Sequence, residues 1–199
     1  MHSVMVAEYT YLLGKQHDPK NAFLYYLGGI SHDFGKITFP DSILKGEKIV
    51  NESERMMIKR HVHDAVQFMS KFGLPQVVMN IVKYHHERFD GNGYLEGLKG
   101  YDIPLEARIA SLADVYCAIR DQGRQYQKKR SHVEAISILK KSSGQFDPDL
   151  LKSFCELADE YELMMNFKEV KSIEKIQFPF TIIPHFGANS AAAAENYME

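Results

Sequence analysis

Apolar side chains recur at three- and four-residue steps along most of this 199-residue chain. That spacing is the period of an amphipathic α-helix, so the chain is predicted to fold as a succession of helices. The predicted helices cover residues 4–13 and 22–30, a stretch capped by Asn51 or Ser53, residues 76–86, and stretches that begin near Pro104, Ser131 and Asp147.

Some segments depart from this pattern. Residues 90–100 contain four glycines, a density that marks a shaped loop. Only residues 176–183 show a strand-like pattern, and residues 187–199 form an alanine-rich, polar tail. We therefore expect an all-α helical bundle with a glycine-rich loop in one domain over residues 1–165, followed by a C-terminal extension and tail over residues 166–199.

Composition narrows the class of protein. A hydrophobic share of 45% with 12% aromatic residues suffices for a sizeable core. The net charge of −2 gives no sign of a protein that coats DNA or lies on a membrane surface. No apolar run approaches the ~18 residues of a membrane span, so membrane insertion is not expected. Two cysteines make no disulfide framework, and the predicted location is the reducing cytoplasm.

Nine histidines beside two cysteines indicate that a metal site here would be built from imidazole and carboxylate. Several such side chains lie on or next to apolar faces, where an unpaired polar group is costly. These residues are His32, Asp33, His61, His85, His86 and Asp114. Metal ions at the centre of a helical bundle would explain all of them.

The pattern allows two ions, with the Asp33 carboxylate as a bridge between them. One ion would be held by His2, His32 and Asp114 together with that carboxylate, and the other by His61, His85 and His86. Two ions about 3.5–4 Å apart can share a hydroxide and hold a phosphodiester for in-line attack, as expected of a phosphohydrolase. The remaining histidines are predicted bystanders, namely His17, His63, His132 and His185.

Several motifs share the order and spacing of a known family. They are HDFGK at residues 32–36, HHERFDGNGY at residues 85–94 and ADV at residues 113–115. In these motifs, and over about residues 2–155, the sequence resembles the HD-GYP branch of the HD phosphohydrolase superfamily.

The resemblance implies a role for each matching position. The matching metal ligands are His2, His32, Asp33, His61, His85, His86 and Asp114, for two or possibly three divalent ions. Iron or manganese is favoured, and zinc or nickel is compatible. Asp33 and Lys36 match catalytic positions, and Lys36 and Arg124 match positions that contact substrate phosphate. Within the glycine-rich loop, Asp90, Gly93 and Tyr94 are further candidates for substrate binding.

The same resemblance implies a cytoplasmic bacterial phosphodiesterase of second-messenger signalling. It would hydrolyse a cyclic dinucleotide, first of all c-di-GMP to pGpG or GMP, with cyclic GMP-AMP as the alternative substrate. Its expected partners are a GGDEF or other signalling domain, which would contact the glycine-rich loop, and a second copy in a homodimer. Family members usually carry an upstream sensory or receiver domain, so a missing N-terminal part is expected.

Two positions depart from the family pattern. Leu95 stands where the family has the proline of its Gly-Tyr-Pro signature, and Cys117 stands where the family has an aspartate. These departures motivate an alternative, a catalytically degenerate module that binds a nucleotide or docks a protein. The intact set of ligand residues argues against it, since buried polar groups are costly to keep without a use.

Overall fold

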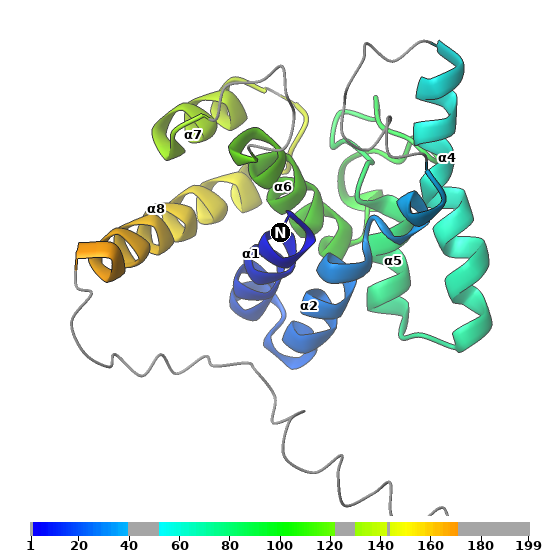
Figure 1. Cartoon of the computed structure of the whole chain (residues 1–199), viewed down its shortest axis with the longest axis horizontal. Coiled ribbons are helices and arrows are strands. Elements are labelled where there is room, and N and C mark those ends of the chain that lie inside the picture. The colour runs from blue at the N-terminus through cyan, green and yellow to red at the C-terminus, as the bar shows by residue number, and fades with distance from the viewer. Residues whose placement is uncertain (1, 40–51, 122–129, 143, 171–199) are drawn as a thin grey trace, which may run out of the picture. The chain divides into compact units, whose positions relative to one another are not determined.

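The computed structural model describes residues 2–39, 52–121, 130–142 and 144–170 (Figure 1). Within these ranges the chain forms helices joined by turns and irregular loops, without a strand. The expected all-α fold is therefore confirmed. The strand-like segment at residues 176–183 and the tail at residues 187–199 lie outside the described residues.

The helices follow the predicted order. They are α1 (His2–His17), α2 (Ala22–Ser31), α4 (Glu52–Met69), α5 (Gln76–Tyr84), α6 (Leu105–Arg120), α7 (His132–Lys141) and α8 (Pro148–Val170). Short 3-10 turns lie between them: η1 (Pro19–Asn21), η2 (Phe34–Thr38), η3 (Ser70–Phe72) and η4 (Gly100–Asp102). Helix α5 ends two residues before the predicted end, so His85 and His86 lie in the turn after it.

Local side-chain contacts explain where the later helices begin. At the start of α7, Ser131 accepts a hydrogen bond from the Glu134 backbone, and the Glu134 carboxylate accepts one from the Ser131 backbone. This capping box satisfies two backbone donors that the helix leaves open. Before α8, Asp147 Oδ1 accepts from the backbone amides of Asp149 and Leu150, at 3.0 and 3.3 Å.

The main core forms where α1, α6 and α8 pack together. Tyr9, Tyr116 and Phe154 are almost fully buried there, with ring centroids 5.1 to 5.6 Å apart. Such tilted and edge-on aromatic pairs add to the stabilisation from buried area. Figure 1 shows α6 beside α1 and α2, and these three helices contact one another directly.

A smaller core joins α4 to α5 through Ala65, Met69, Val78 and Val82. Helix α4 also packs on η2, so the segment that follows α2 lies against it. From the sequence, Met56, Met57, Met69 and Met79 are expected to fill the core. Met69 is buried, but the prediction is wrong for Met56, whose side chain is 66% exposed.

The described residues up to Leu163 form one compact unit, and the described residues 164–170 belong to a second. The predicted division at residue 165 into a domain and an extension stays a prediction. Among the described residues, no helix has the length and apolar character needed to cross a membrane.

Candidate metal centre

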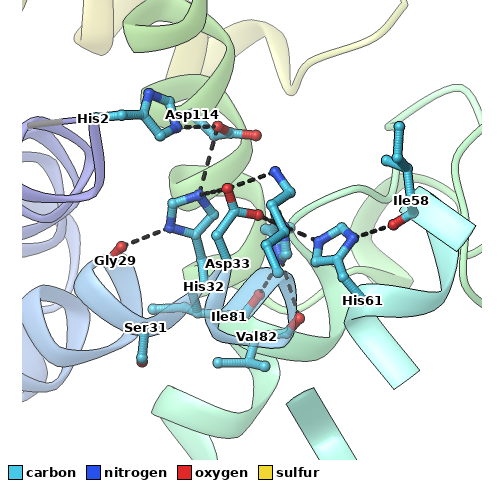
Figure 2. Close-up of polar contacts among 12 residues, drawn as sticks. His2, Gly29, Ser31, His32, Asp33, Ile58, His61, Ile81, Val82 and Asp114 are labelled. Atoms are coloured by element: carbon cyan, nitrogen blue, oxygen red, sulfur yellow. Dashed lines mark hydrogen bonds and ion pairs between the residues drawn. The ribbon is translucent and has the colours of Figure 1, made fainter. Parts of the chain in front are cut away.

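The Asp33 carboxylate lies in the turn after α2 and faces imidazoles on two sides (Figure 2). Its Oδ1 lies 3.3 Å from His61 Nε2 and 3.9 Å from His85 Nε2. Its Oδ2 lies 3.4 Å from His32 Nε2. One carboxylate thus offers an oxygen to each of two neighbouring sets of ligands, as a bridging carboxylate must.

The ligand-type side chains gather into two groups. The first group contains Asp33, His61, His85 and His86, and the second contains His2, His32 and Asp114. In each group the potential ligand atoms lie within 4.8 Å of one another. The structure therefore brings together all seven predicted metal ligands, from α1, α4, α6 and the turns after α2 and α5. That they bind metal stays a prediction.

Backbone carbonyls orient three of the imidazoles. The Nδ1–H of His32 donates to the carbonyl of Gly29 at 2.7 Å, and that of His61 donates to the carbonyl of Ile58. The Nδ1–H of His85 is shared between the backbone carbonyls of residues 81 and 82, at 3.0 and 3.1 Å. A carbonyl on Nδ1 fixes the tautomer and leaves the lone pair of Nε2 facing the site.

Four atoms that face the site are buried and have no hydrogen-bond partner in the part of the chain that is described. They are the Nε2 atoms of His32, His61 and His85 and the Oδ1 atom of Asp33. A buried polar atom without a partner costs about 1–3 kcal/mol, and native proteins hold few of them. Divalent ions bound by nitrogen and oxygen ligands would satisfy all four atoms, so the donor set fits such ions.

Burial and mutual contact set the charges in the cluster. Burial lowers the pKa of His85 well below the usual histidine value and that of His86 to about 4. Burial opposes the charge of His32 too, but the nearby carboxylates of Asp114 and Asp33, 3.6 and 3.4 Å from its Nε2, outweigh burial and raise the pKa of His32 to about 10. Burial disfavours the ionised carboxylates, yet contacts with the imidazoles hold the pKa of Asp33 and of Asp114 well below the usual range. Ionised carboxylates and neutral imidazoles are the forms that bind metal, so Asp33, Asp114, His85 and His86 are in that form, whereas His32 would release a proton when an ion binds.

Gly35 allows η2 to approach α4 closely enough for this geometry. A Cβ on Gly35 would lie 1.9 Å from the backbone oxygen of His61, a distance that no side chain tolerates. Asp33 and Lys36 were predicted as site residues from the sequence, but the need for a glycine between them, at residue 35, was not. The only signal was its fixed place in the HDFGK motif.

Lys36 lies beside the cluster. Its Nζ is 2.6 Å from Asp33 Oδ2, and its side chain remains 31% exposed. It is the only lysine or arginine of the described residues that forms an ion pair with one of the two cluster carboxylates. A partly exposed ammonium at that position is placed to meet an anion that approaches the cluster.

The candidate substrate residues of the glycine-rich loop lie in different surroundings. Asp90 binds Arg88 through both carboxylate oxygens and accepts from the Asn92 backbone, so its oxygens are engaged within the loop. The Tyr94 ring stacks on the His86 ring instead, with centroids 4.7 Å apart. Substrate binding by Asp90, Gly93 and Tyr94 stays a prediction, and Arg124 lies outside the described residues.

Neither ligand group includes the described bystander histidines or the two departures from the family pattern. His17 and His63 are exposed, as predicted, and Leu95 is 41% exposed on the loop. Cys117 is buried in the core, where burial raises the pKa of its thiol. His132 has a structural setting that the sequence did not reveal, because it contacts the Tyr116 hydroxyl and the Asp159 carboxylate. His185 lies outside the described residues.

Comparison with known proteins identifies relatives of this chain. Residues 2–150 match the HD domain family. Cyclic di-GMP phosphodiesterase PA4108 of Pseudomonas aeruginosa is 32% identical over 164 residues, which cover 81% of this chain and 39% of that protein. The 3'3'-cGAMP-specific phosphodiesterase 1 of Vibrio cholerae is 34% identical over 164 residues, covering 80% and 38%. This chain thus spans about two fifths of the length of these curated relatives.

A solved structure shares the fold. Bd1817, an HDG"Y"P protein from Bdellovibrio bacteriovorus, superposes with a TM-score of 0.65 at 22% identity, covering 79% of this chain and 51% of that one. The family recognised from the motifs is confirmed by the match over residues 2–150. The chain belongs to the HD domain family.

Proposed function

We propose that this chain is a metal-dependent phosphodiesterase that hydrolyses a cyclic dinucleotide, most readily c-di-GMP. The observation that carries the proposal is the pair of ligand groups on either side of the Asp33 carboxylate. Four of their potential ligand atoms are buried, face the site and have no hydrogen-bond partner among the described residues. Native proteins hold few buried polar atoms without a hydrogen-bond partner, so four such atoms at one site favour a bound ion.

The residues divide into two sets of ligands. His61, His85 and His86 would hold one ion and His2, His32 and Asp114 the other, with Asp33 between them. Bound divalent ions would supply Lewis-acid polarisation of a phosphodiester and activation of water at neutral pH. Asp33 would bridge the two ions, because one of its oxygens faces His61 and the other faces His32.

Lys36 supplies a positive charge beside the proposed ions. Its ammonium would donate a hydrogen bond to a phosphate oxygen of the substrate. There it would stabilise the negative charge that develops on the phosphate oxygens in the transition state. Its partial exposure supports this role, because an incoming phosphate can exchange with Asp33 as its partner. Arg124, by its place in the sequence, is proposed as a second phosphate contact.

The choice of substrate rests on the relatives. One similar protein is named a cyclic di-GMP phosphodiesterase and another a 3'3'-cGAMP-specific phosphodiesterase, at 32% and 34% identity. Hydrolysis of a cyclic dinucleotide is common to both names. We favour c-di-GMP over cyclic GMP-AMP, with pGpG or GMP as product. We favour iron or manganese as the metal because the family resemblance implies them; imidazole and carboxylate ligands suit both ions, and zinc as well. A cytoplasmic location, a homodimer and a signalling-domain partner complete the proposal.

The test is a hydrolysis assay on protein prepared without oxygen and loaded with iron or manganese. The linear and mononucleotide products of c-di-GMP, cyclic GMP-AMP and pGpG are separated and counted. The wild-type protein is expected to cleave at least one cyclic dinucleotide, and Asp33→Ala is expected to abolish cleavage. His63→Ala is the matched control, since it removes an exposed imidazole outside both groups. Absence of any product from the loaded wild-type protein would refute the proposal.

The alternative is a degenerate module that binds a nucleotide or docks a protein without turnover. Leu95 and Cys117 favour it, because both depart from the family pattern. The same assay separates the two hypotheses. A degenerate module would bind c-di-GMP in equilibrium dialysis and release it unchanged from metal-loaded protein.

A further inference from the structure

His86 differs from the other imidazoles in how it is oriented. His32, His61 and His85 each donate Nδ1–H to a backbone carbonyl. Among the residues that the structure describes, none makes a hydrogen bond with the His86 ring. Its ring instead lies against three aromatic rings of the described residues, with His85 at 4.0 Å, Tyr94 at 4.7 Å and His61 at 5.2 Å between centroids.

Tyr94 makes the most parallel of these contacts. The planes of the Tyr94 and His86 rings differ by 28°, against 43° for His85 and 85° for His61. Because those two neighbours belong to the same proposed ligand group, Tyr94 is, among the described residues, the ring against His86 that comes from outside that group. The Lys59 ammonium also lies 5.6 Å from the centroid of the Tyr94 ring, within the range of a cation–π contact.

The loop holds Tyr94 firmly against the ligand turn. The Tyr94 backbone amide donates to the carbonyl of His86 at 3.3 Å. At Gly93 a Cβ would lie 2.4 Å from the Arg88 backbone nitrogen, so only glycine permits this approach. The buried Glu87 carboxylate fastens the far side of the loop, because its Oε1 accepts from the backbone amides of residues 96 and 97 at 2.7 and 3.0 Å.

We propose that Tyr94 is a positioning residue that holds the His86 imidazole in place for the ion shared by Asp33, His61 and His85. The stacked face of Tyr94 takes the role that a backbone carbonyl takes for the other three imidazoles. In this account the glycine-rich loop is an orienting element of the metal centre, and the aromatic ring rather than the hydroxyl of Tyr94 does the orienting. Groups that orient a ligand affect metal affinity about 10–100-fold when they are replaced.

The experiment is a titration of the metal-free protein with Co²⁺, read by calorimetry and by the visible absorption of the bound ion. The wild-type protein is expected to bind two equivalents. Tyr94→Leu is expected to weaken one equivalent about 10–100-fold, with a change in the corresponding absorption bands, and to leave the other unchanged. Tyr94→Phe is expected to behave as the wild type. Tyr101→Leu is the matched control, since Tyr101 is 72% exposed and outside both ligand groups.

A double-mutant cycle separates positioning from a general structural effect. In a His86→Ala background, Tyr94→Leu is expected to cause no further loss of affinity, because the ring that it positions is gone. An equal loss in both backgrounds would overturn the inference, as would unchanged Co²⁺ binding by Tyr94→Leu or a loss in Tyr94→Phe as large as in Tyr94→Leu. Circular dichroism of each variant checks that the helices remain.

This inference rests on the proposed metal centre, and the titration tells their failures apart. If the wild-type protein binds no Co²⁺, both the metal centre and the role of Tyr94 are refuted. If the wild-type protein binds two equivalents and Tyr94→Leu binds them with the same affinities, the metal centre stands and only the role of Tyr94 fails.

Discussion

Lys36 Nζ lies 2.6 Å from Asp33 Oδ2, the carboxylate oxygen that faces His32. The ion pair thus joins a partly exposed cation to the carboxylate between the two ligand groups. In the proposed function, the ammonium exchanges this partner for a substrate phosphate.

Lys36→Met should therefore separate metal binding from catalysis. We expect the variant to bind the same number of metal ions as the wild type, because Lys36 is not a ligand. We expect kcat to fall about 100-fold, since one charge that stabilises the transition state is lost. Steady-state kinetics with the preferred cyclic dinucleotide measures this. Lys71→Met, at an exposed position in η3, is the control. If kcat of Lys36→Met equals that of the wild type, the role of Lys36 in catalysis is refuted.

Gly35→Ala should damage the metal centre through the backbone. The added Cβ would lie 1.9 Å from the His61 backbone oxygen, so η2 and α4 must move apart. We expect a loss of about 1–3 kcal/mol in the free energy of unfolding, as for an overpacked core, together with weaker metal binding. Urea denaturation and Co²⁺ titration measure the two effects.

Gly73→Ala is the matched control for that variant. Gly73 has a φ of 60° and no atom within 4 Å of the added Cβ. The Gly73→Ala variant should lose about 1 kcal/mol in the free energy of unfolding, because alanine is strained at this φ, and should keep its metal affinity. Equal metal binding by the two variants would contradict the role assigned to Gly35.

Metal should stabilise the fold as well as support catalysis. A ligand that binds only the folded state at about 100 times its Kd adds about 2.7 kcal/mol to the free energy of unfolding. We expect Mn²⁺ at such a concentration to raise the midpoint of urea unfolding of the wild-type protein, and chelation to reverse the change. Asp33→Ala should show little of this effect. An equal response in both proteins would indicate metal binding elsewhere.

Arg108→Leu should destabilise the fold without touching the metal ligands. Arg108 pairs with Asp147, whose side chain is 3% exposed and also caps α8. Removing the arginine leaves a buried carboxylate without its countercharge, which costs about 3 kcal/mol or more. Urea denaturation measures the loss. Arg60→Leu is the control, because Arg60 pairs with Asp64 at a position that is 72% exposed, where ion pairs contribute under about 1 kcal/mol.

The sequence predicted the helices and the ligand residues because both leave local signals. Apolar periodicity marks α1, α2 and α6, and polar side chains on apolar faces mark His61, His85 and Asp114. Ser131 was predicted as the start of a helix because serine is a common capping residue, and the structure adds the capping box with Glu134. These features depend on neighbours in the chain, so the sequence carries them directly.

Contacts between distant segments could not be foreseen in the same way. The stack of Tyr94 on His86 and the approach of Gly35 to His61 depend on how a loop and a turn fold back. His132 gave no local signal, since its partners Tyr116 and Asp159 come from two other helices. The end of α5 at Tyr84 was missed because periodicity continues into the ligand turn.

The most direct test of the account relates metal content to turnover in one preparation. Metal-free protein, prepared without oxygen, receives increasing equivalents of Fe²⁺ or Mn²⁺, and hydrolysis of c-di-GMP and cyclic GMP-AMP is followed by product formation at each step. The account predicts saturation at two or more ions per chain, with hydrolysis appearing as the second equivalent binds. Binding of less than one ion per chain, or no product at full occupancy, would contradict it.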